Sequence, residues 1–226
     1  MVYNNNWTTL FVSLHKYYIG DNMTNMKLNF GKEESNNMNN TAKIYIFLTR
    51  TNTVLSNIIH FLTKSEYTHA GLSLDNNLDW LYSFSRVHKN NPFIGGFMHE
   101  NVTDGVYAAK VDIPCAIYEL EIDLLTYDKV KKRINSMFGE RHKYHYNIKG
   151  LIYYYFNKKK DRPYHYFCSE FVAEILIECG ATKHKMIPSL TKPKDLTNIP
   201  DLKLIFWGNI KEYKNSFIFD ETSVLN

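Results

Sequence analysis

The chain has 226 residues, of which 44% are hydrophobic, and it carries a formal net charge of +4 at pH 7. This length and composition are enough for one good hydrophobic core and favour one domain over two. The three cysteines have no metal-like spacing and imply no disulfide framework, which suits a reducing compartment and a bacterial surface equally.

Residues 1–41 are rich in Asn and other polar residues, and we expect a poorly ordered N-terminal extension with a short helical piece around Leu10–Tyr18. Asn4–Asn6 and Lys16 interrupt every apolar stretch, so the sequence predicts no secretory signal and no transmembrane segment. The cellular location stays unassigned, with the cytoplasm as the default expectation.

A buried strand followed by a helix is predicted after the extension. Residues 42–49 are β-branched and aromatic, which is typical of a strand. Residues 53–63 place apolar side chains on one face of a helix, with Thr51 or Thr53 available as the N-cap. His60 lies inside this helix, where we expect a packed or half-exposed side chain and no catalytic role.

A hairpin is predicted next. Residues 65–75 alternate like a strand and carry His69 near its start. The turn at Asn76-Asn77 leads into residues 78–86, which read as the neighbouring antiparallel strand.

Residues 90–105 are predicted to form a loop, because one proline and two glycines interrupt any regular element there. The apolar side chains between Phe93 and Met98 either line an acyl-binding cleft or pin a surface loop to the core. His99 and Glu100 follow them without the ligand spacing of a metal site.

A strand and an amphipathic helix come after this loop. Residues 112–124 alternate apolar and polar side chains, so the carboxylates of this strand are expected on its wet face and Cys115 in a structural position. Residues 126–138 are expected as a helix capped by Thr126 or Asp128.

The segment from Lys129 to Arg162 is basic and aromatic, with eleven Lys or Arg residues against two acidic ones. It includes a second predicted helical segment over residues 144–156. Such a segment either contacts an anionic lipid or cell-wall polymer, or forms helices whose lysines are solvated and whose tyrosines pack inward. No nucleic acid is expected as a partner, because no nucleic-acid-binding motif accompanies the charge.

Residues 166–176 predict the start of a buried helix with Cys168 in its first turn and a stop at Gly180. In that position the free backbone N–H groups and the positive end of the helix dipole lower the pKa of a thiol and favour the thiolate. The alternative is that Cys168 is one more small buried hydrophobic residue. The rest of the chain is predicted as a loop, a closing strand and a C-terminal tail, over residues 188–193, 202–207 and 214–226.

A cysteine at a helix N-terminus and a histidine on a strand are the nucleophile and base of a Cys/His site. The sequence THAG at residues 68–71 resembles a "[ST]-H-[AV]-G" strand, and FCSEFV at residues 167–172 resembles a "[YF]-C-S-E-[LF]-V" helix start. Both patterns are those of the circularly permuted papain-like branch of the NlpC superfamily, the YiiX- and YaeF-like amidases. The histidine precedes the cysteine in that branch too, and its relatives include lecithin–retinol acyltransferase.

The resemblance implies an α+β, permuted papain-like fold over residues 42–213, in which an antiparallel sheet packs on the cysteine helix. It also implies that Cys168 attacks an amide or ester carbonyl with His69 as base and acid, through a thioester and without a metal or cofactor. His165 is a rival base. We prefer His69, because a residue so close to Cys168 in sequence rarely faces back onto the thiol.

The family places a third polar group on the strand beside the histidine, where it orients the imidazole. The matching position is near Ser83, which can accept a hydrogen bond from the ring but supplies no charge. Either Ser83 takes this role, or another group does, such as Glu119 or Glu121.

Two further residues are expected at the site, Tyr166 from its place before Cys168 and Glu170 from the family pattern. Tyr166 is expected to line the oxyanion site beside the backbone N–H of Cys168, and Glu170 is expected to shape the site. The predicted function is hydrolysis of an amide or ester bond in a peptide, cell-wall or lipid substrate. Two alternatives stay open: an acyltransferase with the same Cys/His pair, and a papain-like binding module without activity, for which the uncharged Ser83 is the hint.

Overall fold

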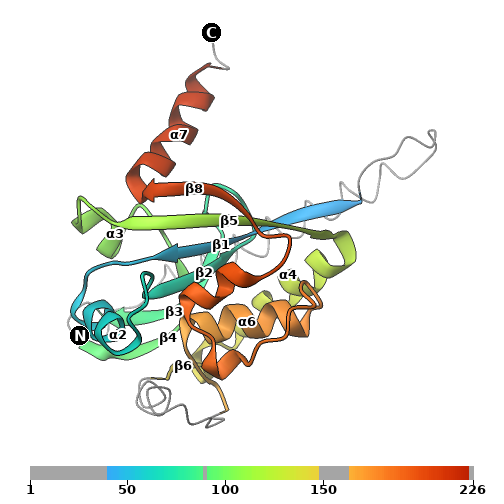
Figure 1. The fold of residues 1–226 in the computed structure, drawn as a ribbon, viewed down its shortest axis with the longest axis horizontal. Coiled ribbons are helices and arrows are strands. Elements are labelled where there is room, and N and C mark those ends of the chain that lie inside the picture. The colour runs from blue at the N-terminus through green and yellow to red at the C-terminus, as the bar shows by residue number, and fades with distance from the viewer. Residues whose placement is uncertain (1–39, 89–90, 148–162, 224–226) are drawn as a thin grey trace, which may run out of the picture. The chain divides into compact units, whose positions relative to one another are not determined.

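The part of the chain that the structure describes is a mixed α/β unit built on a curled, mostly antiparallel sheet (Figure 1). The structure is a computed structural model, and it describes residues 40–88, 91–147 and 163–223. From Asn40 onward the chain forms one compact unit. The expected combination of an antiparallel sheet with packed helices is confirmed at this level.

Eight strands of the described residues form the sheet in the order β7-β6-β4-β3-β2-β1-β5-β8. Their bounds are β1 Thr41–Thr49, β2 His69–Ser73, β3 Leu81–His88, β4 Asn91–Glu100, β5 Pro114–Asp123, β6 His145–Tyr146, β7 His165–Tyr166 and β8 Lys203–Asn209. Neighbouring strands run antiparallel except β6 and β7, which are parallel.

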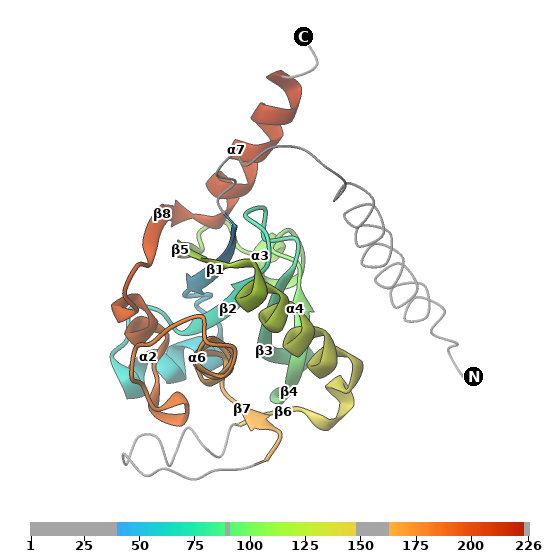
Figure 2. The same cartoon turned by 90° about the vertical axis from the view of Figure 1, so that its right-hand side faces the viewer.

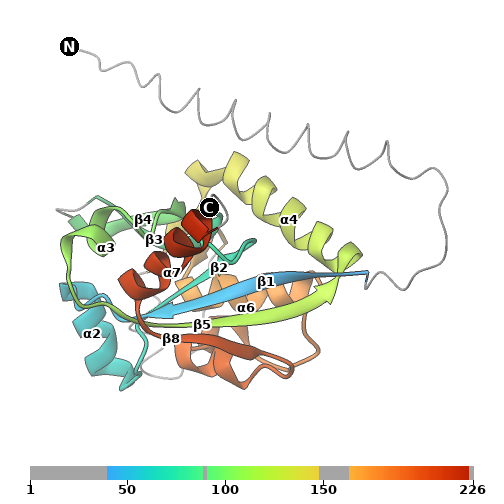
Figure 3. The same cartoon turned by 90° about the horizontal axis from the view of Figure 1, so that it is seen from above.

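The helices lie between and after the strands. Their bounds are α2 Val54–Thr63, α3 Gly105–Ala109, α4 Leu124–Gly139, α6 Cys168–Glu178 and α7 Ile210–Ser223, with short 3-10 turns η1 Arg141–Lys143, η2 Pro188–Leu190 and η3 Pro193–Asn198. Figure 3 shows α2 at the end of β1, where the chain turns back toward β2.

Strand β1 is buried on both sides, which explains its continuous apolar sequence. Ile44, Ile46 and Leu48 belong to one hydrophobic cluster, and Tyr45 and Phe47 belong to the other. Because side chains alternate along a strand, the two clusters lie on opposite faces of the sheet.

Helices α4 and α6 lie side by side on the face of Ile44 and Ile46 (Figure 2). In α4 the side chains of Val130, Ile134 and Met137 are buried, whereas Lys129 and Lys132 are exposed. In the described part of the basic segment, this arrangement agrees with the alternative in which the lysines are solvated and the apolar side chains pack inward. Residues 148–162 lie outside the described residues.

The opposite face of the sheet is covered by α3 and the start of α7. Tyr107 of α3 and Ile210 and Tyr213 of α7 are buried in the cluster that contains Phe47. The ring of Tyr107 packs edge-on against Phe47, with 6.0 Å between the centroids.

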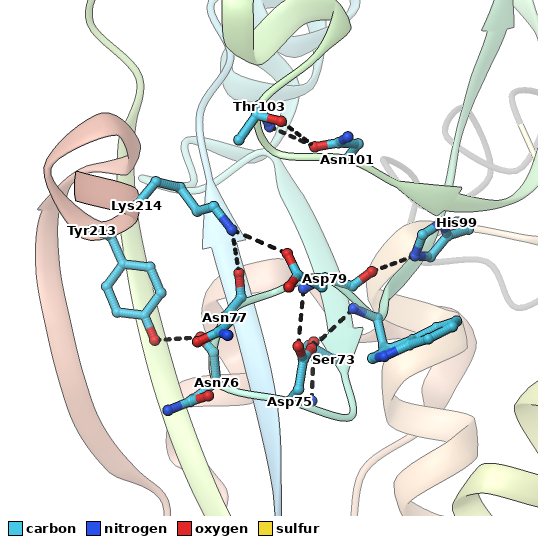
Figure 4. Close-up of polar contacts among 11 residues, drawn as sticks. Ser73, Asp75, Asn76, Asn77, Asp79, His99, Asn101, Thr103, Tyr213 and Lys214 are labelled. Carbon is cyan, nitrogen blue, oxygen red and sulfur yellow. Dashed lines mark hydrogen bonds and ion pairs between the residues drawn. The ribbon is translucent and has the colours of Figure 1, made fainter. Parts of the chain in front are cut away.

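The turn between β2 and β3 is held by its own side chains and by α7 (Figure 4). Asp75 Oδ1 accepts a hydrogen bond from the backbone N–H of Trp80 at 2.9 Å. Tyr213 donates its hydroxyl to the carbonyl of Asn76, and Lys214 donates to the carbonyl of Asn77, both at 2.7 Å. The predicted hairpin is confirmed, and it is fixed at its closed end.

Most of the other predicted elements are confirmed with small changes in their bounds. Residues 42–49 form β1, residues 53–63 form α2 with Thr53 as its N-cap, and residues 112–124 contain β5. The helix expected at residues 126–138 starts two residues earlier, because Asp123 caps it and accepts from Thr126 N at 2.8 Å.

The loop predicted for residues 90–105 is wrong except at residues 101–104, which form a turn. Residues 91–100 are strand β4, which pairs with β3 from Arg86 opposite Gly95 to Leu81 opposite Glu100. A Cβ on Gly95 would lie 2.6 Å from the Ser85 carbonyl oxygen, so this glycine permits a close approach of two strands. Of the two places expected for Phe97, beside a cleft or packed into the core, the structure shows the second, with 2% of the residue exposed.

The expected C-terminal tail from residue 214 onward is helical up to Ser223 in α7. The helical piece expected around residues 10–18 lies outside the described residues, as do residues 148–156 of the second helical segment, whose residues 145–146 form β6. Within the described ranges, every helix is too short or too polar to cross a membrane.

Candidate functional site

His69 is the first residue of β2 and lies where β2 and β3 separate. The described ladder between these strands pairs Ser73 with Leu81 and Leu72 with Tyr82, and it ends before reaching His69. A Cβ on Gly71 would lie 2.7 Å from Leu81 Cδ1 and 3.3 Å from the carbonyl oxygen of Tyr82, both on β3. The glycine of the THAG sequence therefore has a packing role.

Cys168 is the first residue of α6, as the sequence predicts, and its exposed fraction is 3%. The carboxylate of Glu170 accepts a hydrogen bond from the backbone N–H of Phe167 at 3.0 Å, which fixes the start of the helix. Ser169 donates its hydroxyl to the carbonyl of Thr191 at 2.7 Å. Glu170 thus contacts the backbone directly before Cys168.

His69 and Cys168 are brought together at the site. Burial lowers the pKa of His69, but the charge of Glu100 and the hydrogen bond and charge of Cys168 act in the opposite direction and prevail. The pKa of His69 consequently lies well above its ordinary value of 6.5. This histidine is a good partner for a thiolate, because it holds its second proton near neutral pH.

The carboxylate of Glu100, at the end of β4, is the third group of the site. His69 Nε2 lies 3.1 Å from both Glu100 Oε1 and Oε2. A carboxylate only accepts hydrogen bonds, so Nε2 carries a proton and Nδ1 is the ring nitrogen left to face the thiol. Glu100 therefore orients the imidazole and fixes its tautomer.

Glu100 is nearly enclosed, with 9% of its side chain exposed, and its two oxygens accept further hydrogen bonds. Ser83 Oγ donates to Oε1 at 2.7 Å, and Tyr107 OH donates to Oε2 at 3.0 Å. Burial raises the pKa of Glu100, but the charge and hydrogen bond of His69 and the hydroxyl of Ser83 lower it to about 2. The carboxylate is ionised throughout the physiological range.

Ser83, the first candidate for the group that orients the imidazole, is fully buried, and its hydroxyl donates to Glu100. The carboxylates named as alternatives lie elsewhere on β5. Glu119 Oε1 pairs with Lys43 at 3.0 Å, and Glu121 is exposed. On β1 the register places Tyr45 opposite Glu119 and Thr49 opposite His69, so Glu119 lies about 13 Å away along the strands.

Sequence reasoning missed Glu100 because it placed this residue at the end of a loop. A signal was present: apolar Phe97 and Met98 are followed by polar His99 and Glu100, in a segment that can pair with residues 81–86. Adjacent residues of a strand point to opposite faces. His99 accordingly binds the carbonyl of Asp79 at the turn (Figure 4), while Glu100 binds His69.

Tyr166 and His165, the alternative base, form hydrogen bonds to Glu174 and to Pro163. Tyr166 donates its hydroxyl to Glu174 Oε1 at 2.8 Å, and its ring packs on Phe84 at 5.1 Å between centroids. His165 Nδ1 binds the carbonyl of Pro163 at 2.8 Å. Burial, followed by the charge of Cys168, raises the pKa of the Tyr146 hydroxyl well above 10.0.

Metal ligation has no visible basis in the described ranges. No group of three or more His, Cys, Asp or Glu side chains there could hold a metal ion. Cys115 is buried on β5, and burial followed by the charge of Glu212 raises its pKa to about 12. That thiol has a structural environment.

Comparison of the sequence with protein-family models and with curated proteins finds no match in either case. The assignment of a function therefore rests on the residues of the site.

Proposed function

We propose that the protein is a cysteine hydrolase that cleaves an amide or ester bond through a thioester on Cys168. The observation that carries this proposal is the chain of contacts from Cys168 to His69 and from His69 Nε2 to Glu100. A nucleophile, a base and a buried carboxylate that orients the base are the three parts of a Cys/His/acid triad.

In the proposed reaction, Cys168 is a thiolate paired with the His69 imidazolium. The sulfur attacks the carbonyl carbon, and the oxyanion that forms is stabilised by the backbone N–H of Cys168 at the start of α6. His69 gives its proton to the leaving amine or alcohol, and the acyl group stays on sulfur as a thioester. His69 then removes a proton from water, which attacks the thioester and releases the acid.

The resemblance to the permuted papain-like amidases supports the same assignment. The histidine strand comes before the cysteine helix in the chain, and α6 packs against the antiparallel sheet that carries His69. The hint for an inactive binding module was an uncharged third residue at Ser83. Glu100 supplies the charge that Ser83 lacks, so this hint no longer favours a lapsed site.

The first test is the pH dependence of iodoacetamide alkylation, mapped to single cysteines by mass spectrometry. An unpaired thiol titrates near ~8.5, whereas one paired with histidine falls to roughly 3.5–7.5. Cys168 should react well below neutral pH, and His69→Ala should move its titration upward. Cys115 and Cys179 serve as internal controls, because both are buried and their pKa values are raised by burial first.

Turnover is then tested with p-nitrophenyl acetate as a small activated ester. The wild type should release p-nitrophenol and carry a transient acetyl group on Cys168, and Cys168→Ala should do neither. Transfer of that acetyl group to an added amine in preference to water would mark an acyltransferase. An unreactive Cys168, or one that titrates like a free thiol in both chains, would remove the enzymatic proposal altogether.

A further inference from the structure

Each oxygen of the Glu100 carboxylate has its own buried hydroxyl donor, and the two donors come from different elements. Ser83 of β3 donates to Oε1 at 2.7 Å, and Tyr107 of α3 donates to Oε2 at 3.0 Å. His69 Nε2 sits between the two oxygens at 3.1 Å from each. Neither hydroxyl belongs to the nucleophile, the base or the acid of the proposed reaction.

We propose that Tyr107 and Ser83 are positioning residues of the site, which clamp the Glu100 carboxylate so that both oxygens stay directed at His69 Nε2. As a statement about catalysis this inference rests on the proposed function. The clamp itself depends only on the contacts of Glu100.

The Tyr107 hydroxyl is held in place independently of Glu100. Asp104 caps α3 by accepting from the backbone N–H of Gly105 at 2.7 Å, and the backbone N–H of Tyr107 bonds to the Asp104 carbonyl at 3.1 Å. The Tyr107 ring is 5% exposed and packs on Phe47. A donor fixed in this way is preorganised for the carboxylate.

The second donor is equally constrained. Ser83 is fully buried and lies opposite Met98, two residues from Glu100 along β4. A serine at this diagonal position reaches Oε1 with a single rotation about its side chain. Because one donor approaches from the sheet and the other from α3, rotation of the carboxylate would break one of the two bonds.

An uncompensated carboxylate in this position would be costly, since burial disfavours the charged form. The titratable groups that face Glu100 are His69 of β2 and Tyr107 of α3, and Cys168 of α6 contacts His69. Hydrogen bonds to the charged form keep a carboxyl group ionised. The two hydrogen bonds thus fix the orientation of the Glu100 carboxylate and keep it ionised.

The test is a titration of the Glu100 carboxyl carbon by NMR on the full chain with ¹³C-labelled Glu, in the wild type, Tyr107→Phe and Ser83→Ala. Tyr213→Phe is the matched control: Tyr213 is also 5% exposed, lies in the same cluster, and donates its hydroxyl to the Asn76 carbonyl. The wild-type signal should remain that of a carboxylate well below the ordinary Glu pKa of ~4.3. Each clamp variant should raise the midpoint by about one to two pH units, and Tyr213→Phe should leave it in place.

A second measurement needs no substitution. In the wild type with ¹³C-labelled Tyr, the ring carbon that bears the Tyr107 hydroxyl should shift together with protonation of Glu100. The clamp would be overturned if the Glu100 carboxyl titrated with the same midpoint in Tyr107→Phe as in the wild type. It would also be overturned if the chemical shift of the Tyr107 ring carbon did not change when Glu100 is protonated. These readouts need no activity, so a clamp confirmed beside an unreactive Cys168 would refute the proposed function alone.

Discussion

The Nε2 atom of His69 lies 3.1 Å from each carboxylate oxygen of Glu100, and only 14% and 9% of the two side chains are exposed. The two residues are 31 positions apart and lie on β2 and β4, with β3 between them in the sheet. The described pairing of β2 with β3 ends before it reaches His69. The side chain of His69 can therefore contact Glu100 of β4, although β3 lies between their strands.

The first prediction concerns the charge of Glu100. In Glu100→Gln the imidazolium of His69 loses its buried counter-charge, so the alkylation titration of Cys168 should move toward that of a free thiol. Hydrolysis of p-nitrophenyl acetate should fall on the order of 10²–10⁴-fold, the range seen when an orienting acid is neutralised. Glu119→Gln is the control, because Glu119 pairs with Lys43 outside the site. Equal effects of the two substitutions would contradict the role of Glu100.

The second prediction is the pH dependence of stability. The folded pKa of Glu100 is lowered to about 2, so its contribution is present above the unfolded value of ~4.3 and is lost as the pH falls through the folded value. The folded pKa of His69 is raised well above 6.5, so its contribution is present below ~6.5 and is lost as the pH rises through the folded value. Both contributions are complete between about pH 4.3 and pH 6.5.

Urea denaturation from pH 3 to pH 9 measures this window. The free energy of unfolding should be greatest inside it, and the double variant His69→Gln, Glu100→Gln should show a flatter profile on both sides. Removing one partner alone leaves a buried charge, so His69→Ala at pH 7 should cost about 3–5 kcal/mol. A wild-type profile no steeper than that of the double variant would count against the ion pair.

The sequence predicts those parts of the site that depend on local pattern. Cys168 at the first turn of a helix and His69 on a strand follow from apolar periodicity and from two short motifs, and the structure places both as expected. The position of Ser83 also follows, because counting along a hairpin fixes which residues neighbour one another. Strands, helices and their caps are local consequences of the chain.

The identity of the third group depends on a longer-range pairing. Gly95 and Gly96 read as loop residues in sequence, yet in β4 they let the backbones of β3 and Tyr144 come close. That misassignment hid the strand register that places Glu100 beside Ser83 and His69. The interaction of Tyr107 with Glu100 was equally hidden, because nothing in its own segment indicates which strand α3 packs against.

The third prediction concerns the start of the cysteine helix. In Glu170→Ala the backbone N–H of Phe167 loses the acceptor found at 3.0 Å, which should lower the free energy of unfolding by about 1–2 kcal/mol. Alkylation of Cys168 should slow as well, because the first turn of α6 is no longer fixed. Glu170→Gln keeps an acceptor oxygen and should retain most of the stability. If both substitutions cost the same, the charge of Glu170 matters more than its hydrogen bond.

The fourth prediction separates a structural role of Tyr166 from an oxyanion role. Its hydroxyl is donated to Glu174 Oε1 at 2.8 Å, so Tyr166→Phe should lower stability by about 1 kcal/mol and leave the turnover of p-nitrophenyl acetate unchanged. Loss of an oxyanion donor would instead reduce kcat about 10²–10³-fold. Glu174→Gln weakens the same hydrogen bond from the other side and should reproduce the stability change. A large fall in kcat in Tyr166→Phe but not in Glu174→Gln would instead place the Tyr166 hydroxyl at the oxyanion site. Both substitutions weaken the hydrogen bond between the two side chains, but only Tyr166→Phe removes a hydroxyl that could contact the developing negative charge.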